Sequence, residues 1–167
     1  MRYFSLLPLL ALSLSCGVEA SLGLLPGEGV LAIQTDKNVY DWSADGVEGT
    51  LLVIATVTNT GSAPVYARLG DAFNAAVEQE TIFAAEASDG RVERLAGDTW
   101  LTLPGAHLVE GFKTVVLMPG RSYTLHAPIP APRVTGNARI HITWFEDASA
   151  VGTGTPHIDI SNTFVLR

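Results

Sequence analysis

Apolar and polar residues alternate along most of the chain after residue 30. From Leu51 to Val57 every second residue is apolar, and Thr56 and Thr58 fall on the opposite face. A period of two residues is typical of a β-strand with one buried face, whereas an amphipathic helix repeats every 3.6 residues. Residues 137–145 follow the same alternation. The pattern therefore predicts an all-β domain.

Turn-forming residues divide the rest of the chain into further short apolar runs. The predicted strands span residues 31–35, 49–59, 65–69, 81–87, 91–95, 99–103, 112–117, 121–127, 137–145 and 162–166. Asp89-Gly90 separates two of these runs and is favoured in tight turns, so we expect a hairpin over residues 81–95. Residues 71–79 are expected to form at most one short helix. We expect about seven to nine of these ten runs to be strands of the domain, and such a number at roughly ten-residue spacing is typical of a β-sandwich or a β-barrel.

The first residues of the chain have the layout of an export signal. Met1-Arg2 supplies a positive start, and residues 3–15 are apolar and uncharged. This run is too short to cross a hydrocarbon core of about 30 Å as a stable helix, so we expect a cleavable signal peptide.

Where the signal is cleaved decides whether the mature protein is held at a membrane. Ser13-Leu14-Ser15-Cys16 resembles the bacterial lipobox, which implies a lipid-modified Cys16 as the new N-terminus. The expected organisation is then a signal peptide over residues 1–15, a flexible tether over 16–30 and a β-domain over 31–167. Gly17 after the cysteine implies sorting to the outer membrane if the cell is Gram-negative. The alternative is a secretory signal over residues 1–20, cleaved after Ala20, which would release a secreted protein.

Composition narrows the range of functions. The chain has a formal net charge of −7, 16% charged residues and no basic cluster, so we expect no nucleic-acid partner. Cys16 is the only cysteine, which predicts a domain without a disulfide, a thiolate zinc site or a cysteine nucleophile. About 140 residues suffice for one sizeable hydrophobic core.

Three phrases of the sequence carry a family resemblance. The phrases Thr35-Asp36-Lys37-Asn38-Val39-Tyr40, residues 57–65 and residues 117–125 resemble immunoglobulin-like domains of bacterial surface lipoproteins. The resemblance implies an antiparallel, immunoglobulin-like β-sandwich. The chain is also similar, more weakly, to the bacterial intracellular proteinase-inhibitor domain, which shares an Asn-Thr-Gly phrase and a late Pro-Gly turn. Antibody-type domains carry a cysteine pair that is missing here, so we expect Trp100 or Trp144 to fill the core.

Loops at the ends of such a sandwich are the expected interaction surfaces. The candidate interaction loop contains Asp41, Trp42, Asp45 and Glu48, and residues 71–79 and 147–155 are further candidates. Trp42 is either an exposed recognition residue or a side chain folded back onto the domain edge. Tyr123 alternates in phase with Leu125 and is expected to point inward.

Two histidines are weak candidates for a metal site. His126 and His141 fall on the outward phase of their predicted strands and would share a face if those strands were neighbours. No third ligand at useful spacing accompanies them, so we expect no metal and no cofactor. Asp41, Asp45 and Glu48 lack the ligand spacing of an EF-hand loop.

The sequence also lacks the motifs of common catalytic sites, and we expect no enzyme. The function expected from the residues and the resemblance is a non-catalytic envelope lipoprotein. It would attach to the membrane through lipid on Cys16 and contact an unknown envelope or extracellular protein or polymer through its loops. The alternative is a secreted protease inhibitor. A metal-binding or enzymatic domain is the least expected of these functions.

Overall fold

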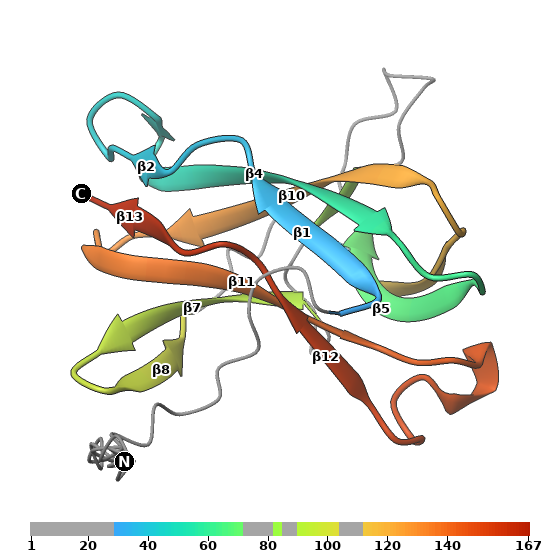
Figure 1. The fold of residues 1–167 in the computed structure, drawn as a ribbon. Helices are drawn as coiled ribbons and strands as arrows, with labels where there is room; N and C mark the ends of the chain where they lie inside the picture. Colours follow the sequence, from blue (N-terminus) through green and yellow to red (C-terminus); the bar gives the residue numbers. More distant parts are fainter. Residues whose placement is uncertain (1–28, 72–81, 85–89, 104–111) are drawn as a thin grey trace, which may run out of the picture.

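The strands of the part of the chain that the structure describes form two sheets (Figure 1). The computed structural model describes residues 29–71, 82–84, 90–103 and 112–167, and these residues contain thirteen strands and one short 3₁₀ helix, Ala148–Ala150. The all-β class predicted from the alternating pattern is therefore confirmed. None of the helical structure in the described ranges has the length and apolar character needed to span a bilayer.

The first sheet has seven strands and runs in the order β1-β4-β10-β6-β5-β9, with β3 paired to β4. Its strands are β1 (Leu31–Thr35), β3 (Gly46–Val47), β4 (Thr50–Asn59), β5 (Val65–Asp71), β6 (Ile82–Ala84), β9 (Phe112–Leu117) and β10 (Ser122–Pro130). The long antiparallel pair β4–β10 lies at its centre, and only β6–β10 is parallel.

The second sheet has six strands in the order β2-β13-β11-β7-β8, with β12 paired to β11. Its strands are β2 (Val39–Tyr40), β7 (Gly90–Ala96), β8 (Thr99–Thr102), β11 (Gly136–Trp144), β12 (His157–Ile160) and β13 (Phe164–Leu166). The pair β2–β13 is parallel, and the other pairs are antiparallel.

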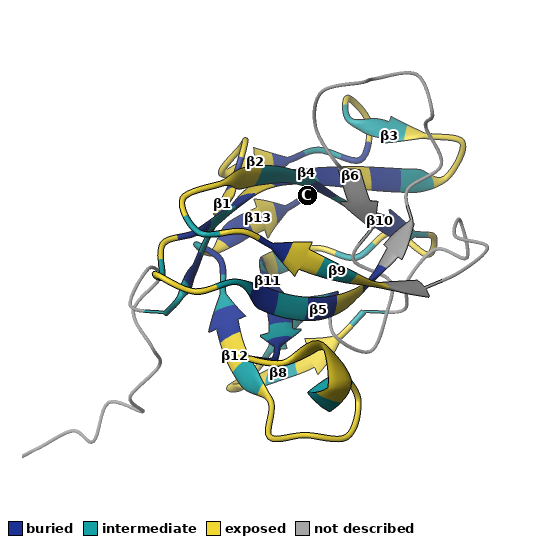
Figure 2. Cartoon of the chain, turned by 90° about the vertical axis from the view of Figure 1, so that its right-hand side faces the viewer, coloured by how far each residue is buried: buried dark blue, intermediate teal, exposed yellow. Residues whose placement is uncertain are grey.

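Alternate residues from both sheets build one hydrophobic core. Leu51 to Val57 contribute every second side chain from β4, and Ala138, Ile140 and Ile142 contribute from β11. Figure 2 shows this alternation as bands of buried and more exposed residues along the strands. The period-two pattern thus gives each strand one face for the core and one for solvent.

The aromatic residues divide between the core and the surface. Trp144 belongs to the core, as one of the two expected alternatives, while Trp100 lies on the surface of β8 and is only partly buried. Tyr123 packs against the core, as predicted, and its hydroxyl accepts a hydrogen bond from the Met118 backbone N–H at 2.9 Å.

The predicted hairpin over residues 81–95 is wrong. β6 pairs with β10 and β5 in the first sheet, whereas β7 pairs with β11 and β8 in the second. Gly90 is part of β7 and lies opposite Ile142. Pairing with distant strands, which lets Val92 enter the common core, outweighs the local turn preference of Asp-Gly.

Short elements account for the other differences from the predicted strands. β2, β3 and β12 are two to four residues long and were not predicted. The expected helix over residues 71–79 lies outside the described residues except for Asp71, which ends β5.

Candidate functional site

The candidate interaction loop lies at one end of the first sheet. β1 and β4 are antiparallel, with Leu31 opposite Asn59, while β3 pairs with the start of β4 at Leu51 and Thr50. We call these two ends of the sheet the Leu31 end and the Thr50 end. At about 3.4 Å per residue, the ten residues of β4 separate them by roughly 30 Å. The loop over residues 41–48 is therefore at the Thr50 end, far from Leu31 (Figure 1).

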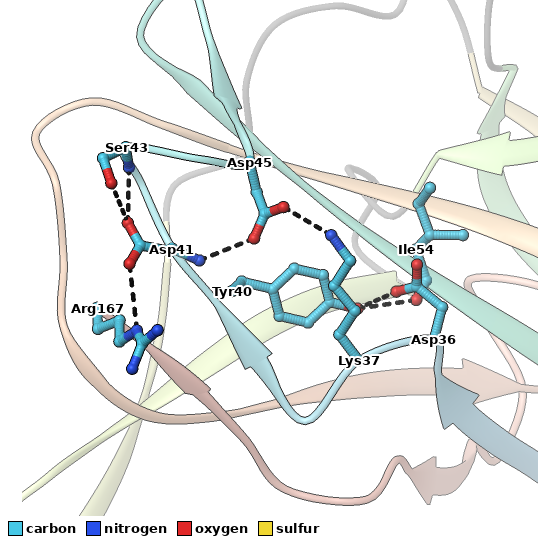
Figure 3. A network of polar contacts seen from close by, with 8 residues as sticks. All are labelled: Asp36, Lys37, Tyr40, Asp41, Ser43, Asp45, Ile54 and Arg167. Carbon is cyan, nitrogen blue, oxygen red and sulfur yellow. Dashed lines mark hydrogen bonds and ion pairs between the residues drawn. The ribbon is translucent and has the colours of Figure 1, made fainter.

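The loop backbone is closed by reciprocal hydrogen bonds between two aspartates (Figure 3). The Asp41 carboxylate accepts from the Ser43 backbone N–H at 2.8 Å and from its hydroxyl at 2.6 Å. The Asp45 carboxylate accepts from the Asp41 backbone N–H at 2.9 Å, and the Asp45 N–H donates to the Asp41 carbonyl at 2.7 Å. This reciprocity resembles a helix capping box and fixes a single tight turn.

Both carboxylates of the turn are also paired with cations. Lys37 Nζ lies 2.6 Å from Asp45, and Arg167 Nε lies 3.2 Å from Asp41. The pKa of Asp41 is lowered, chiefly by its bonds to Ser43, and the pKa of Asp45 is lowered, chiefly by Lys37. The two carboxylates are ionised at neutral pH and are committed to bonds within the domain.

Tyr40 connects this turn to the rest of the domain. Its side chain is buried, and its hydroxyl bonds to the Asp36 carboxylate and lies 3.1 Å from the Ile54 carbonyl. Burial, with Asp36 beside the hydroxyl, raises the pKa of Tyr40 well above its usual range. The Arg167 N–H donates to the Tyr40 carbonyl at 3.0 Å, which joins the loop to the C-terminal strand.

Trp42 is a core residue and not an exposed recognition residue. Its side chain is 5% exposed, and its indole N–H donates to the Val134 carbonyl at 2.7 Å. Its backbone N–H donates to the Arg167 carbonyl at 2.8 Å. Of the two alternatives for Trp42, the folded-back one is found.

Of the four loop residues that the sequence indicated as candidates, only Glu48 is exposed. Val47 is 71% exposed and lies at the tip of the β3–β4 hairpin. Glu48 and Gly49, which form the turn, both have positive φ, as in a type I′ turn. Glycine in the second turn position is a signal for such a hairpin, and it could have indicated that Val47 is presented to solvent.

His126 and His141 do not share a face. His126 is on β10 in the first sheet, and His141 is on β11 in the second. Burial lowers the pKa of both side chains. No group of three potential metal ligands occurs among the residues that the structure describes.

His141 belongs instead to a charged cluster that sequence reasoning missed. The Glu93 cluster consists of Glu93, Arg91, Arg139 and His141, on the adjacent strands β7 and β11. Arg91 Nε lies 3.0 Å from one Glu93 oxygen, and Arg139 Nε and Nη2 both lie 2.9 Å from the other. The cluster depends on Arg139 lying opposite Glu93 in a cross-strand pair. This pair cannot be predicted without knowing the register of β7 against β11.

The other predicted candidates lie apart from the interaction loop or outside the residues that the structure describes. Cys16 and residues 72–79 are not among the described residues. Residues 147–155 follow β11 and precede β12, whose Asp159 accepts a hydrogen bond from the Leu31 N–H. That loop is therefore at the Leu31 end and cannot form one surface with residues 41–48.

Comparison with known proteins assigns no family. No protein-family description matches the chain, and no curated protein is detectably similar in sequence. Among solved structures, it is similar to the one described as the "Putative ApaA Protein from Bordetella pertussis". The two are 17% identical with a TM-score of 0.43, over 81% of this chain and 91% of that chain.

Proposed function

We propose that the protein is a non-catalytic envelope lipoprotein, anchored by lipid on Cys16, that contacts a partner through residues 41–48 of an immunoglobulin-like β-sandwich. The observation that carries the proposal is the position of this loop. The chain reaches the first sheet at its Leu31 end, and the loop lies at the Thr50 end of the same sheet. An anchor before residue 29 would thus leave the loop on the side of the domain that faces away from the membrane.

The strand order supports the immunoglobulin-like assignment. In the immunoglobulin plan, strands A, B and E are neighbours in one sheet and C, F and G in the other. The order β1-β4-β10 corresponds to the first set, and β7-β11-β13 to the second. The extra strands β5 and β6, and the parallel pair β6–β10, are departures from that plan.

The construction of the loop supports a role in binding. Hydrogen bonds within residues 41–45 and to Arg167 hold the backbone in place without a ligand. A loop that is already ordered loses little conformational entropy when it binds. Val47 and Glu48 follow this base in the chain and are exposed, so an apolar and an acidic group are both available to a partner.

The anchor is tested by fractionating cells that express the full chain or its Cys16→Ser variant. We expect the wild-type protein in the detergent phase, with the mass of its N-terminal peptide increased by the lipid, and the variant in the aqueous phase. A wild-type protein that begins at Ser21 and stays aqueous would refute the anchor and favour a secreted binder or inhibitor.

The contact surface is tested by placing a photo-crosslinking amino acid at position 47 in the full chain, in intact cells. The matched control is position 116, because Val116 is also an exposed valine on a strand but lies near the Leu31 end. We expect a discrete crosslinked species from position 47 that position 116 does not give. Equal crosslinking at both positions, or none at position 47, would contradict the proposal.

A further inference from the structure

The Glu93 cluster occupies the outer face of the second sheet, away from the candidate interaction loop. On β7 and β11, Arg139 is opposite Glu93 and His141 is opposite Arg91, so the four side chains form a compact array. The carboxylate and the imidazole are each only 7% exposed, whereas Arg91 and Arg139 are 32% and 20% exposed. The guanidinium groups therefore lie between the buried carboxylate and solvent.

The cluster is not electrically balanced. Burial, followed by the charge of Arg91, lowers the pKa of His141, so its ring is neutral at pH 7. The Nδ1 atom of this neutral ring lies 3.0 Å from Arg91 Nη2 and 3.1 Å from Glu93 Oε1, and its Nε2 atom lies 3.3 Å from the Thr143 hydroxyl, so the imidazole contacts both the cation and the carboxylate of the cluster. Two guanidinium groups and one carboxylate then leave a formal charge of +1, in a chain whose net charge is −7.

The guanidinium groups also keep hydrogen-bonding capacity. The contacts with Glu93 and His141 use the Nε and Nη2 atoms of Arg91 and Arg139. Within the described part of the chain, their Nη1 atoms have no acceptor. A planar guanidinium group with unused N–H donors is well suited to binding the oxygens of a carboxylate or a phosphate.

Neighbouring side chains hold these donors in place before any ligand arrives. The Arg139 guanidinium stacks over the Trp100 ring, with its Cζ 4.1 Å from the ring centroid. Glu93 restrains both arginines from its two oxygens. The ordering of two long side chains, which normally opposes binding, is therefore already accomplished in the free protein.

From this geometry we infer that the outer face of β7 and β11 binds an oxyanionic group, a carboxylate or a phosphate, between Arg91 and Arg139. Such a group completes the charge balance of the cluster and occupies the unused donors. This site is separate from residues 41–48, and its existence does not depend on the lipid anchor or on the proposed loop partner.

The three tryptophans allow a direct test by NMR of the indole N–H signals in the full chain carrying Cys16→Ser. Trp100 reports on the cluster, while the indoles of Trp42 and Trp144 are bonded inside the domain and serve as internal controls. We expect saturable shifts of the Trp100 signal alone during titration with inorganic phosphate or with acetate at constant ionic strength. The relative affinities of these two probes identify which oxyanion the site prefers.

Two variants separate anion binding from a purely structural role. Arg91→Gln removes one positive charge and should weaken binding at least tenfold, and Glu93→Gln removes the competing carboxylate and should strengthen binding. A matched control is Arg133→Gln, because Arg133 is exposed and lies outside the cluster. If Arg91→Gln does not fold, Arg91→Lys, which keeps the charge but loses the fork, should still bind more weakly than wild type. No saturable shift of Trp100 in the wild type, or unchanged affinity in the folded arginine variant, would overturn the inference.

Discussion

Replacing Asp159 with alanine tests how the two sheets are joined. Asp159 is on β12 of the second sheet, and its carboxylate accepts hydrogen bonds from the Leu31 N–H of β1 and from the Trp144 indole N–H, each at 2.8 Å. The residue is 6% exposed. Gly29 fits against it so closely that a Cβ there would lie 1.4 Å from the carboxylate Oδ1. This one carboxylate therefore joins β1 of the first sheet to β11 and β12 of the second sheet.

The expected cost of Asp159→Ala follows from the donors that it leaves behind. Each buried donor without an acceptor costs about 1–3 kcal/mol. The variant no longer has to bury a polar carboxyl group, which offsets part of this cost. We expect the free energy of unfolding to fall by about 2–4 kcal/mol. At about 3 °C per kcal/mol for a domain of this size, the melting temperature should fall by roughly 6–12 °C.

Urea unfolding followed by tryptophan fluorescence measures this loss. The matched control is Asp98→Ala in the turn between β7 and β8, because Asp98 is exposed and its replacement should change the stability by less than about 0.5 kcal/mol. A loss below about 1 kcal/mol for Asp159→Ala would show that water replaces the carboxylate easily. The reasoning about a buried connection would then be wrong.

Two further substitutions test the description of the core and the Glu93 cluster. The folded-state pKa of His141 lies below the unfolded value of about 6.5, so the stability that it contributes is complete above that pH and declines as the pH falls below it. Unfolding midpoints between pH 8 and 5.5 should fall less in His141→Asn than in wild type, and parallel curves would contradict the neutral buried ring. Trp42→Phe removes the hydrogen bond to Val134 and part of the core volume, so it should cost about 1–3 kcal/mol in the free energy of unfolding. The same change at the partly exposed Trp100 is the comparison, and an equal loss there would contradict the burial of Trp42.

The alternation of apolar residues was sufficient to predict the class of fold and most of the strands. The range 31–35 and the range 112–117 match β1 and β9, because each has a buried face that local spacing reveals. Pairing between strands was not predictable in this way, as the separation of β6 from β7 shows. Two-residue strands such as β2 are also too short for any period to be visible.

That residues 41–48 form an interaction site stays a prediction, and the sequence indicated little of how these residues are arranged. The polar composition of residues 41–48 indicated a loop, but not that Asp41 and Asp45 are used to close it. The residues next to Trp42 in the sequence do not show whether its side chain points outward or inward. The inward orientation is fixed by the hydrogen bond to the carbonyl of Val134, which is distant in the sequence. His141 was expected to face solvent because its phase is outward, yet its side chain is buried and its ring contacts Arg91 from the adjacent strand. Lipidation of Cys16, the absence of catalysis and the protease-inhibitor alternative remain predictions.

The opposite positions of Leu31 and residues 46–49 have a mechanical consequence. A load applied between an anchor before β1 and a partner held at the β3–β4 turn would run parallel to β1 and β4, which are antiparallel and joined over five register pairs. Under such a shearing load the hydrogen bonds of the ladder share the force and must break together, whereas a load across one end would open them one at a time. If the proposed anchor and loop partner exist, tension between them would therefore act along the direction in which the β1–β4 pair resists separation best.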